Sequence, residues 1–118
     1  MLKEGLKKII ENVDGALGVL LLGVDGLPIV EIKKKQELDI GVLAAELTML
    51  YKNAQRTIQN IEFGALQEVS VVAEKTVVIC RAVTEEYYLM LAITPDALAG
   101  KGRYLLRKSV EDFKELLL

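Results

Sequence analysis

The chain has 118 residues, and a domain of this size buries roughly two thirds of the surface that its unfolded chain exposes. Its 15 Lys and Arg against 17 Asp and Glu give a net charge of −2, which supplies no broad positive field and argues against nucleic-acid binding. Aromatic residues make up only 5% of the sequence, so we expect an aliphatic core and no stacking pocket for a flat ligand.

The N-terminal residues predict a short helix and then a strand. Apolar residues at helical spacing, with charges between them, indicate an amphipathic helix over 2–13 that has no cleavage site of a secretion signal. The longest apolar stretch, 16–24, is far shorter than the about 20 residues that cross a bilayer as a helix. We therefore expect a cytoplasmic protein without a transmembrane segment.

A hairpin and a long helix follow. Asp25 and Gly26 separate two β-prone runs, 16–23 and 27–35, and this dipeptide is a strong signal for an antiparallel hairpin. From Asp39 to about Asn60, apolar residues recur with the period of an α-helix. The main stripe of this helix is formed by Ile40, Leu43, Ala44, Leu47, Leu50, Tyr51, Ala54, Ile58 and Ile61.

The second half of the chain predicts three more strands and a last helix. The runs 65–74, 76–83 and 87–94 are separated by short polar turns and indicate a meander. Residues 97–118 predict a loop that leads into a final amphipathic helix. The element order is therefore αββαβββα, within a single domain over residues 1–118.

The polar residues among the strands predict the order of the sheet. Runs 16–23, 76–83 and 87–94 are almost wholly apolar, as in strands covered on both faces, whereas the other two are interrupted by polar residues. Pro28 and the lysines at 33–35 suit an edge strand with a solvated end. Strands joined by a hairpin are neighbours, so the first and fifth strands must meet in the middle of the sheet. This gives a five-stranded antiparallel-type sheet of order 2-1-5-4-3. Helices cover both of its faces, so the fold class is α/β (α+β).

Two features have no evident role inside one chain. The strand at 65–74 has neither proline nor lysine to guard its edge, and the long helix carries a second apolar face. One interpretation is that the long helix has a wide face buried within a single chain, which accounts for its second apolar face. The other is a homodimer that pairs the third strands and packs the long helices side by side, which accounts for the strand edge as well. The expected interface residues are Val42, Ala45, Met49, Leu66, Glu68, Val69, Ser70 and Val71.

Residue types that carry enzyme chemistry are scarce. The absence of histidine removes the commonest general base near neutral pH, Ser-His triads and most zinc sites. Cys80 lies in an apolar run, can form no internal disulfide and is expected to be a buried thiol in a reducing compartment. Glu85 and Glu86 are interpreted as a solvated turn. We expect no catalytic residue, metal or cofactor.

The fragment GKGR at 100–103 has part of the pattern of a phosphate-binding loop. A Walker-type loop requires G-x-x-x-x-G-K-[ST], and the fragment lacks both the upstream glycine and the hydroxyl residue. We interpret it as a glycine-hinged entry into the last helix. Anion binding by Lys101 and Arg103 at the helix N-terminus is the alternative.

Three stretches, 14–30, 38–50 and 93–113, resemble the roadblock family, which includes dynein light chains of the roadblock type and bacterial and archaeal regulators of small Ras-like GTPases. The similarity covers about residues 3–116 and depends on the order and spacing of its parts. Its marker residues are Asp25, Gly26 and Pro28 in the hairpin and Gly100 and Arg103 at the last helix.

The resemblance implies a roadblock, profilin-like fold and a homodimer whose third strands join into one sheet. It also implies a non-enzymatic regulator or scaffold that binds a small Ras-like GTPase, with activation of GTP hydrolysis through the partner's own residues as one form of regulation. Lys52, Arg56 and Gln59 of the long helix are the expected partner surface. Two alternatives stay open: an adaptor subunit of a motor or multiprotein complex without GTPase contact, and a small-ligand or nucleotide-binding domain.

Overall fold

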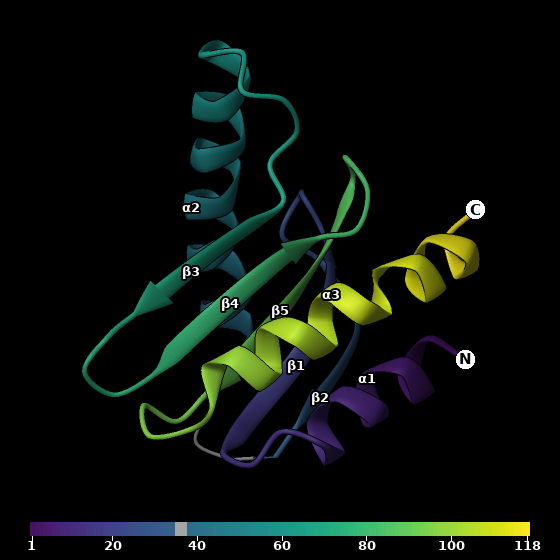
Figure 1. Cartoon of the computed structure of the whole chain (residues 1–118), viewed down its shortest axis with the longest axis vertical. Helices are drawn as coiled ribbons and strands as arrows, with labels where there is room; N and C mark the ends of the chain where they lie inside the picture. The colour runs from purple at the N-terminus through teal and green to yellow at the C-terminus, as the bar shows by residue number, and fades with distance from the viewer. Residues whose placement is uncertain (35–37) are drawn as a thin grey trace.

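The computed structural model describes residues 1–34 and 38–118 (Figure 1). Its elements occur in the expected order αββαβββα. They are α1 (Leu2–Glu11), β1 (Ala16–Gly23), β2 (Pro28–Lys33), α2 (Ile40–Asn60), β3 (Glu68–Val72), β4 (Val77–Ala82), β5 (Tyr87–Ile93) and α3 (Ala99–Leu116). Lys33 and Lys34 are exposed, as expected, whereas Lys35 lies outside the described residues.

A five-stranded antiparallel sheet of order β2-β1-β5-β4-β3 forms the centre of the molecule and confirms the predicted order. The β1–β2 hairpin turns at Gly26, whose φ of 90° favours glycine and whose N–H donates to the Gly23 carbonyl at 3.0 Å. Pro28 is the first residue of the edge strand β2, a position where a missing N–H is tolerated.

Strand side chains alternate between two cores, one on each face of the sheet. On β1, Val19 and Leu21 belong to the core beneath α1 and α3, whereas Leu20 and Leu22 belong to the core beneath α2. Figure 1 shows the same division, with α1 and α3 together on one face and α2 alone on the other. The almost wholly apolar runs of β1, β4 and β5 follow from this double coverage.

The last helix begins earlier than the sequence predicts. α3 starts at Ala99, so the GKGR fragment forms its first turn and not a loop or hinge. Gly102 is buried, and a Cβ at this position would lie 2.9 Å from Leu91 Cδ2 and 3.6 Å from Ile79 Cδ1. The missing side chain lets α3 pack closely on β4 and β5, which is a different use of glycine from the predicted hinge.

Strand β3 is shorter than the predicted run 65–74. The residues before it form a connection in which Glu62 has φ 59° and Gly64 has φ 91°. After the strand, the Ala73 N–H donates to the Thr76 carbonyl at 3.0 Å and closes the turn into β4. Tight turns at both ends therefore limit the strand to five residues.

The buried stripe of α2 is narrower than predicted. Leu50 and Ile61 are 45% and 49% exposed, although the sequence assigns both to the main stripe. Ile61 caps the C-terminal end of the helix, which in Figure 1 extends past the sheet and has no strand beneath it. The fully buried residues of this helix are Ala44, Thr48 and Tyr51.

Candidate interaction surface

β3 is the outermost strand on one side of the sheet, and among the described residues only β4 pairs with it. Val69 packs against the core beneath α2, and Val71 follows on the same face of the strand. Leu66 also packs against this core, but it precedes β3 and does not lie on the strand as predicted. The outer edge carries no lysine or proline, so its backbone groups can pair with another strand.

α2 carries an exposed apolar stripe on the side away from the sheet. Val42 and Met49 are 58% and 63% exposed, and Ala45 between them is exposed as well. Their spacing of three and four residues places them on one line of the helix, opposite the buried Tyr51. Covering a side chain such as Met49, which is 63% exposed, would favour an association by removing apolar surface from water.

The predicted partner surface continues this line. Lys52, Arg56 and Gln59 are all exposed and follow Met49 at spacings of three, four and three residues. Arg56 Nη2 donates to Asn53 Oδ1 at 3.2 Å, which holds the guanidinium along the helix. The structure thus joins the predicted dimer contacts and the predicted partner surface into one stripe, apolar in its first half and polar in its second.

Three further apolar residues are exposed outside the predicted contacts. Phe63 is 76% exposed just beyond α2, where Ile61 is also half exposed, and Val72 is 76% exposed at the end of β3. Phe63 and Ile61 extend the apolar surface past the C-terminal end of α2, whereas Val72 shares the strand face of Glu68 and Ser70.

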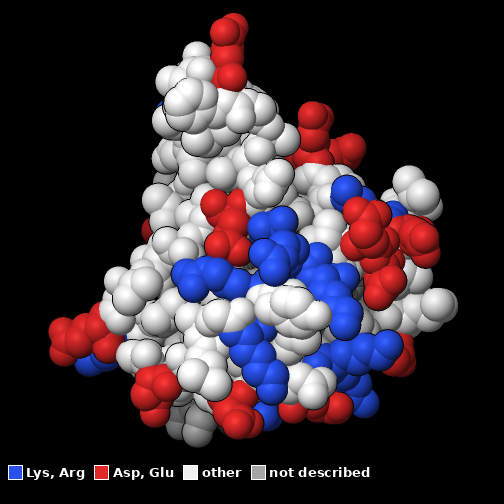
Figure 2. All heavy atoms as spheres, in the orientation of Figure 1, with Lys and Arg blue, Asp and Glu red and all other residues white. Residues whose placement is uncertain are grey.

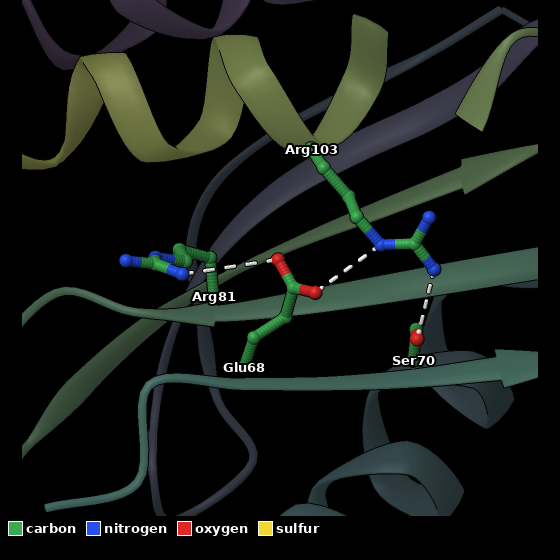
Figure 3. Close-up of polar contacts among 4 residues, drawn as sticks. All are labelled: Glu68, Ser70, Arg81 and Arg103. Carbon is green, nitrogen blue, oxygen red and sulfur yellow. Dashed lines mark hydrogen bonds and ion pairs between the residues drawn. The ribbon is translucent and has the colours of Figure 1, made fainter. Parts of the chain in front are cut away.

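A polar cluster ties α3 to the edge strand (Figure 3). Arg103 Nε donates to Glu68 Oε2 at 3.2 Å, and Arg103 Nη2 donates to Ser70 Oγ at 3.0 Å. Arg81 Nη1 lies 3.9 Å from Glu68 Oε1 on the other side of the carboxylate. Glu68 and Ser70, predicted to lie near the dimer seam, are on β3 but direct their side chains toward α3.

A second polar group lies buried beneath α2. Tyr51 and Tyr88 stack with ring centroids 4.2 Å apart, and the hydroxyls of Thr48 and Tyr88 are hydrogen-bonded. Burial raises the pKa of Tyr88 to about 12 and that of the Cys80 thiol to about 12. The Cys80 thiol is therefore protonated and inaccessible, as predicted, and this group anchors α2 without offering a nucleophile.

The structure weakens the remaining chemical alternatives. Arg103 is engaged by Glu68 and does not act with Lys101 at the N-terminus of α3, as the anion-binding alternative requires. Within residues 1–34 and 38–118, no group of three or more acidic or cysteine side chains could hold a metal ion. None of the helices that the structure describes is long and apolar enough to cross a membrane.

The markers quoted from the sequence have structural roles. Asp25 Oδ1 accepts a hydrogen bond from the Leu27 N–H at 3.1 Å and stabilises the β1–β2 turn, while Arg103 connects α3 to β3. Gly100 has open space around the position of a Cβ, so no close contact explains it.

Together, the sheet order, the three helices and the free β3 edge beside α2 define a roadblock-type domain. The sequence profile of the Roadblock/LC7 domain matches residues 2–93, and the chain belongs to this family. Proteins of this family are generally regulators or adaptors and not enzymes.

Solved structures agree with this assignment. The chain is 33% identical to MglC from Myxococcus xanthus, with 97% of each chain covered and a TM-score of 0.75. A Roadblock/LC7 domain from Streptomyces avermitilis, 17% identical, covers 97% of this chain and 95% of its own with a TM-score of 0.85. The gliding protein MglB from Thermus thermophilus, also 17% identical, covers 96% and 85% with a TM-score of 0.83. At 17% identity, the structures from Streptomyces avermitilis and Thermus thermophilus support the fold alone. No curated protein matches the sequence significantly.

Proposed function

We propose that this chain is a homodimeric regulator or scaffold of a small Ras-like GTPase, formed by one roadblock-type domain over residues 1–118 and acting in the cytoplasm. The observation that carries the proposal is the proximity of two unpartnered surfaces, the outer edge of β3 and the apolar stripe of α2. Val69 of β3 packs into the core beneath α2, and Figure 1 shows the two elements at one end of the molecule. We infer that one second copy covers both, through its own β3 edge and its own α2 stripe.

In the proposed dimer, β3 pairs with its symmetry mate and the two α2 helices lie side by side. The contact is isologous, so Val42, Ala45 and Met49 of one copy face the same stripe of the other. Val69, Val71 and the exposed Val72 lie near the strand seam, while Glu68 and Ser70 stay turned toward α3. The polar second half of the stripe, with Lys52, Arg56 and Gln59, is the surface that we assign to the GTPase.

Family membership supports the regulatory part of the proposal, because roadblock-family proteins are generally regulators or adaptors. The chain supplies no histidine and no accessible thiol, which fits a regulator that arranges the partner's own residues and performs no chemistry itself. The proposed action is stimulation of GTP hydrolysis by the bound GTPase, without any cofactor held by this chain.

The dimer is tested by light scattering on the chain and on two variants. Met49→Glu places a charge in the proposed helix contact, where burial of an unpaired carboxylate is costly, so this variant should be monomeric. Leu98→Glu is the matched control, because Leu98 is 74% exposed and lies before α3 on the other face of the sheet. A Met49→Glu variant that dimerises as well as Leu98→Glu would contradict the helix contact.

The regulatory activity is tested by phosphate release from a purified Ras-like GTPase of the same organism in the presence of the dimer. Stimulation should be lost in a Lys52→Glu/Arg56→Glu variant that still dimerises by light scattering. A stable dimer that binds no such GTPase would contradict the regulatory role and favour the adaptor alternative.

A further inference from the structure

The first half of α3 is basic in a chain whose net charge is −2. Between residues 99 and 110 it carries Lys101, Arg103, Arg107 and Lys108 and no Asp or Glu. Arg81 of β4 lies beside it, because Arg81 and Arg107 line the same groove. Figure 2 shows the blue side chains gathered across α3, with red side chains around them.

Lys101, in the first turn of α3, opposes the stability of the helix. The N-terminal end of a helix has a partial positive charge and is stabilised by carboxylates, not by cations. α3 has no acidic residue in its first turn, and its N-cap Leu98 provides no side-chain hydrogen bond. Lys101 therefore gains nothing from the helix dipole, whereas Arg103 stabilises the fold through its ion pair with Glu68.

Most of the cations are available to a ligand. In the described part of the chain, Lys101, Arg107 and Lys108 are exposed and form no ion pair, whereas Arg103 is held by Glu68. Lys108 Nζ lies 5.7 Å from the centroid of the Tyr104 ring, so an exposed aromatic ring stands among the charges.

A groove adjoins Arg107 and Arg81, whereas Lys101 and Lys108 lie farther round the helix. It lies between the C-terminal half of α3, the end of β4 and the connection from α2 to β3, with a volume of about 690 Å³. Apolar Leu66 and Val110 line it together with Arg81, Arg107 and Lys114. Arg81 Nε is buried and has no hydrogen-bond acceptor among the described residues, while Nη1 of the same guanidinium lies 3.9 Å from Glu68 Oε1.

We propose that the basic face, formed by Lys101, Arg107 and Lys108 of α3 with Arg81 of β4, binds an acidic segment of a partner protein. Carboxylates of the segment contact the exposed cations, and one of its side chains enters the groove beside Arg81. The exposed cations of α3 lie on the face of the sheet opposite the α2 stripe of the proposed dimer contact, and they occur twice in a dimer. The groove itself reaches Gln59, which belongs to the proposed GTPase surface.

The surroundings of the basic face favour a protein over a membrane or a nucleic acid. Glu85 and Glu111 line the groove, and Asp112 and Glu115 follow on α3, so carboxylates border the cations. A flat anionic bilayer or a long polyanion would meet these carboxylates, whereas a short acidic segment can fit between them.

The test uses a fluorescein-labelled peptide of alternating glutamate and leucine, and the same peptide with glutamine at every glutamate position. Fluorescence anisotropy should show that only the glutamate peptide binds and that salt weakens binding. Arg107→Glu/Lys108→Glu should raise the dissociation constant roughly tenfold, because two attractive contacts become repulsive. The matched control is Lys33→Glu/Lys34→Glu, another adjacent exposed pair, which should change it little.

Vesicles of phosphatidylcholine with phosphatidylserine, and duplex DNA, are the competing ligands. Equal loss of peptide binding in both charge-reversal variants would overturn the proposal, since it would show only a general attraction between opposite charges. A stronger affinity for vesicles or DNA than for the peptide would overturn it as well. Light scattering on each variant shows whether the dimer persists, which separates this test from that of the proposed function. If the charge reversal unfolds the chain, Arg107→Gln/Lys108→Gln should still weaken binding roughly threefold.

Discussion

Arg103 in the first turn of α3 donates a hydrogen bond through Nε to Glu68 Oε2 on β3, at 3.2 Å and 35 residues away in the chain. The same guanidinium donates to Ser70 Oγ at 3.0 Å. One side chain therefore connects the last helix to two alternate residues of a strand that has only one neighbour among the described residues. We infer that it keeps this free edge straight enough to pair with a second copy.

Arg103→Met should lower the free energy of unfolding by about 1 kcal/mol, since it removes partly exposed charge-assisted hydrogen bonds but keeps an apolar stem. Urea denaturation measures the change, and Lys101→Met, which breaks no ion pair among the described residues, should cost much less. A double-mutant cycle with Glu68→Gln should show coupling between the two positions. Additive effects of the two substitutions would contradict the contact.

Gly100 and Gly102 stand two residues apart in α3 and should respond oppositely to alanine. Gly100 has open space around it, so Gly100→Ala should raise stability by about 0.5 kcal/mol through helix propensity. At Gly102 the new Cβ would lie 2.9 Å from Leu91 Cδ2 in the core, so Gly102→Ala should lower stability by about 1 kcal/mol. Thermal unfolding of the pair measures the difference, and equal effects would contradict close packing of α3 on β5.

Stability should fall at high pH. Burial raises the pKa of Cys80 and of Tyr88 to about 12 in each case, from ordinary values of 9.0 and 10.0. The unfolded chain then releases protons that the folded chain keeps, so the free energy of unfolding is unaffected by these groups below about pH 9 and decreases from there to about pH 12. The midpoint of urea denaturation, measured across this pH range, tests the effect. The decrease of the midpoint with pH should be smaller in Cys80→Ala. A constant midpoint up to about pH 11 would contradict the burial of both groups.

Val71→Lys should weaken the proposed dimer without unfolding the chain. Lysine on a strand edge opposes pairing with another strand, as the lysines near the end of β2 already do on the other side of the sheet. Sedimentation velocity should show a shift toward monomer, while circular dichroism stays unchanged. Lys75→Ala, in the turn after β3, is a control that should leave the dimer intact.

The sheet order was predictable because burial on both faces leaves a readable pattern. β1, β4 and β5 are almost wholly apolar, and Pro28 marks β2 as an edge. Because strands joined by a hairpin are neighbours, only one order of the sheet agrees with this pattern. The exposed stripe of α2 was predictable for a similar reason, since Val42, Ala45 and Met49 recur at helical spacing outside the main stripe.

Contacts between distant elements were not predictable in the same way. The pairing of Arg103 with Glu68 depends on how α3 lies across the sheet, and no local pattern encodes that placement. The role of Gly102 was missed because a glycine used for close packing has the same sequence signature as one used for a hinge. On α2, the predicted dimer contacts and the predicted partner surface form one exposed stripe. This could be recognised only once the burial of each residue was known.

The mass of the unmodified chain in solution tests the central claim most directly. Multi-angle light scattering on the protein at micromolar concentration should give about twice the chain mass of 13.0 kDa, because the β3 edge and the α2 stripe are both covered in the proposed dimer. A mass of one chain under these conditions would contradict the account.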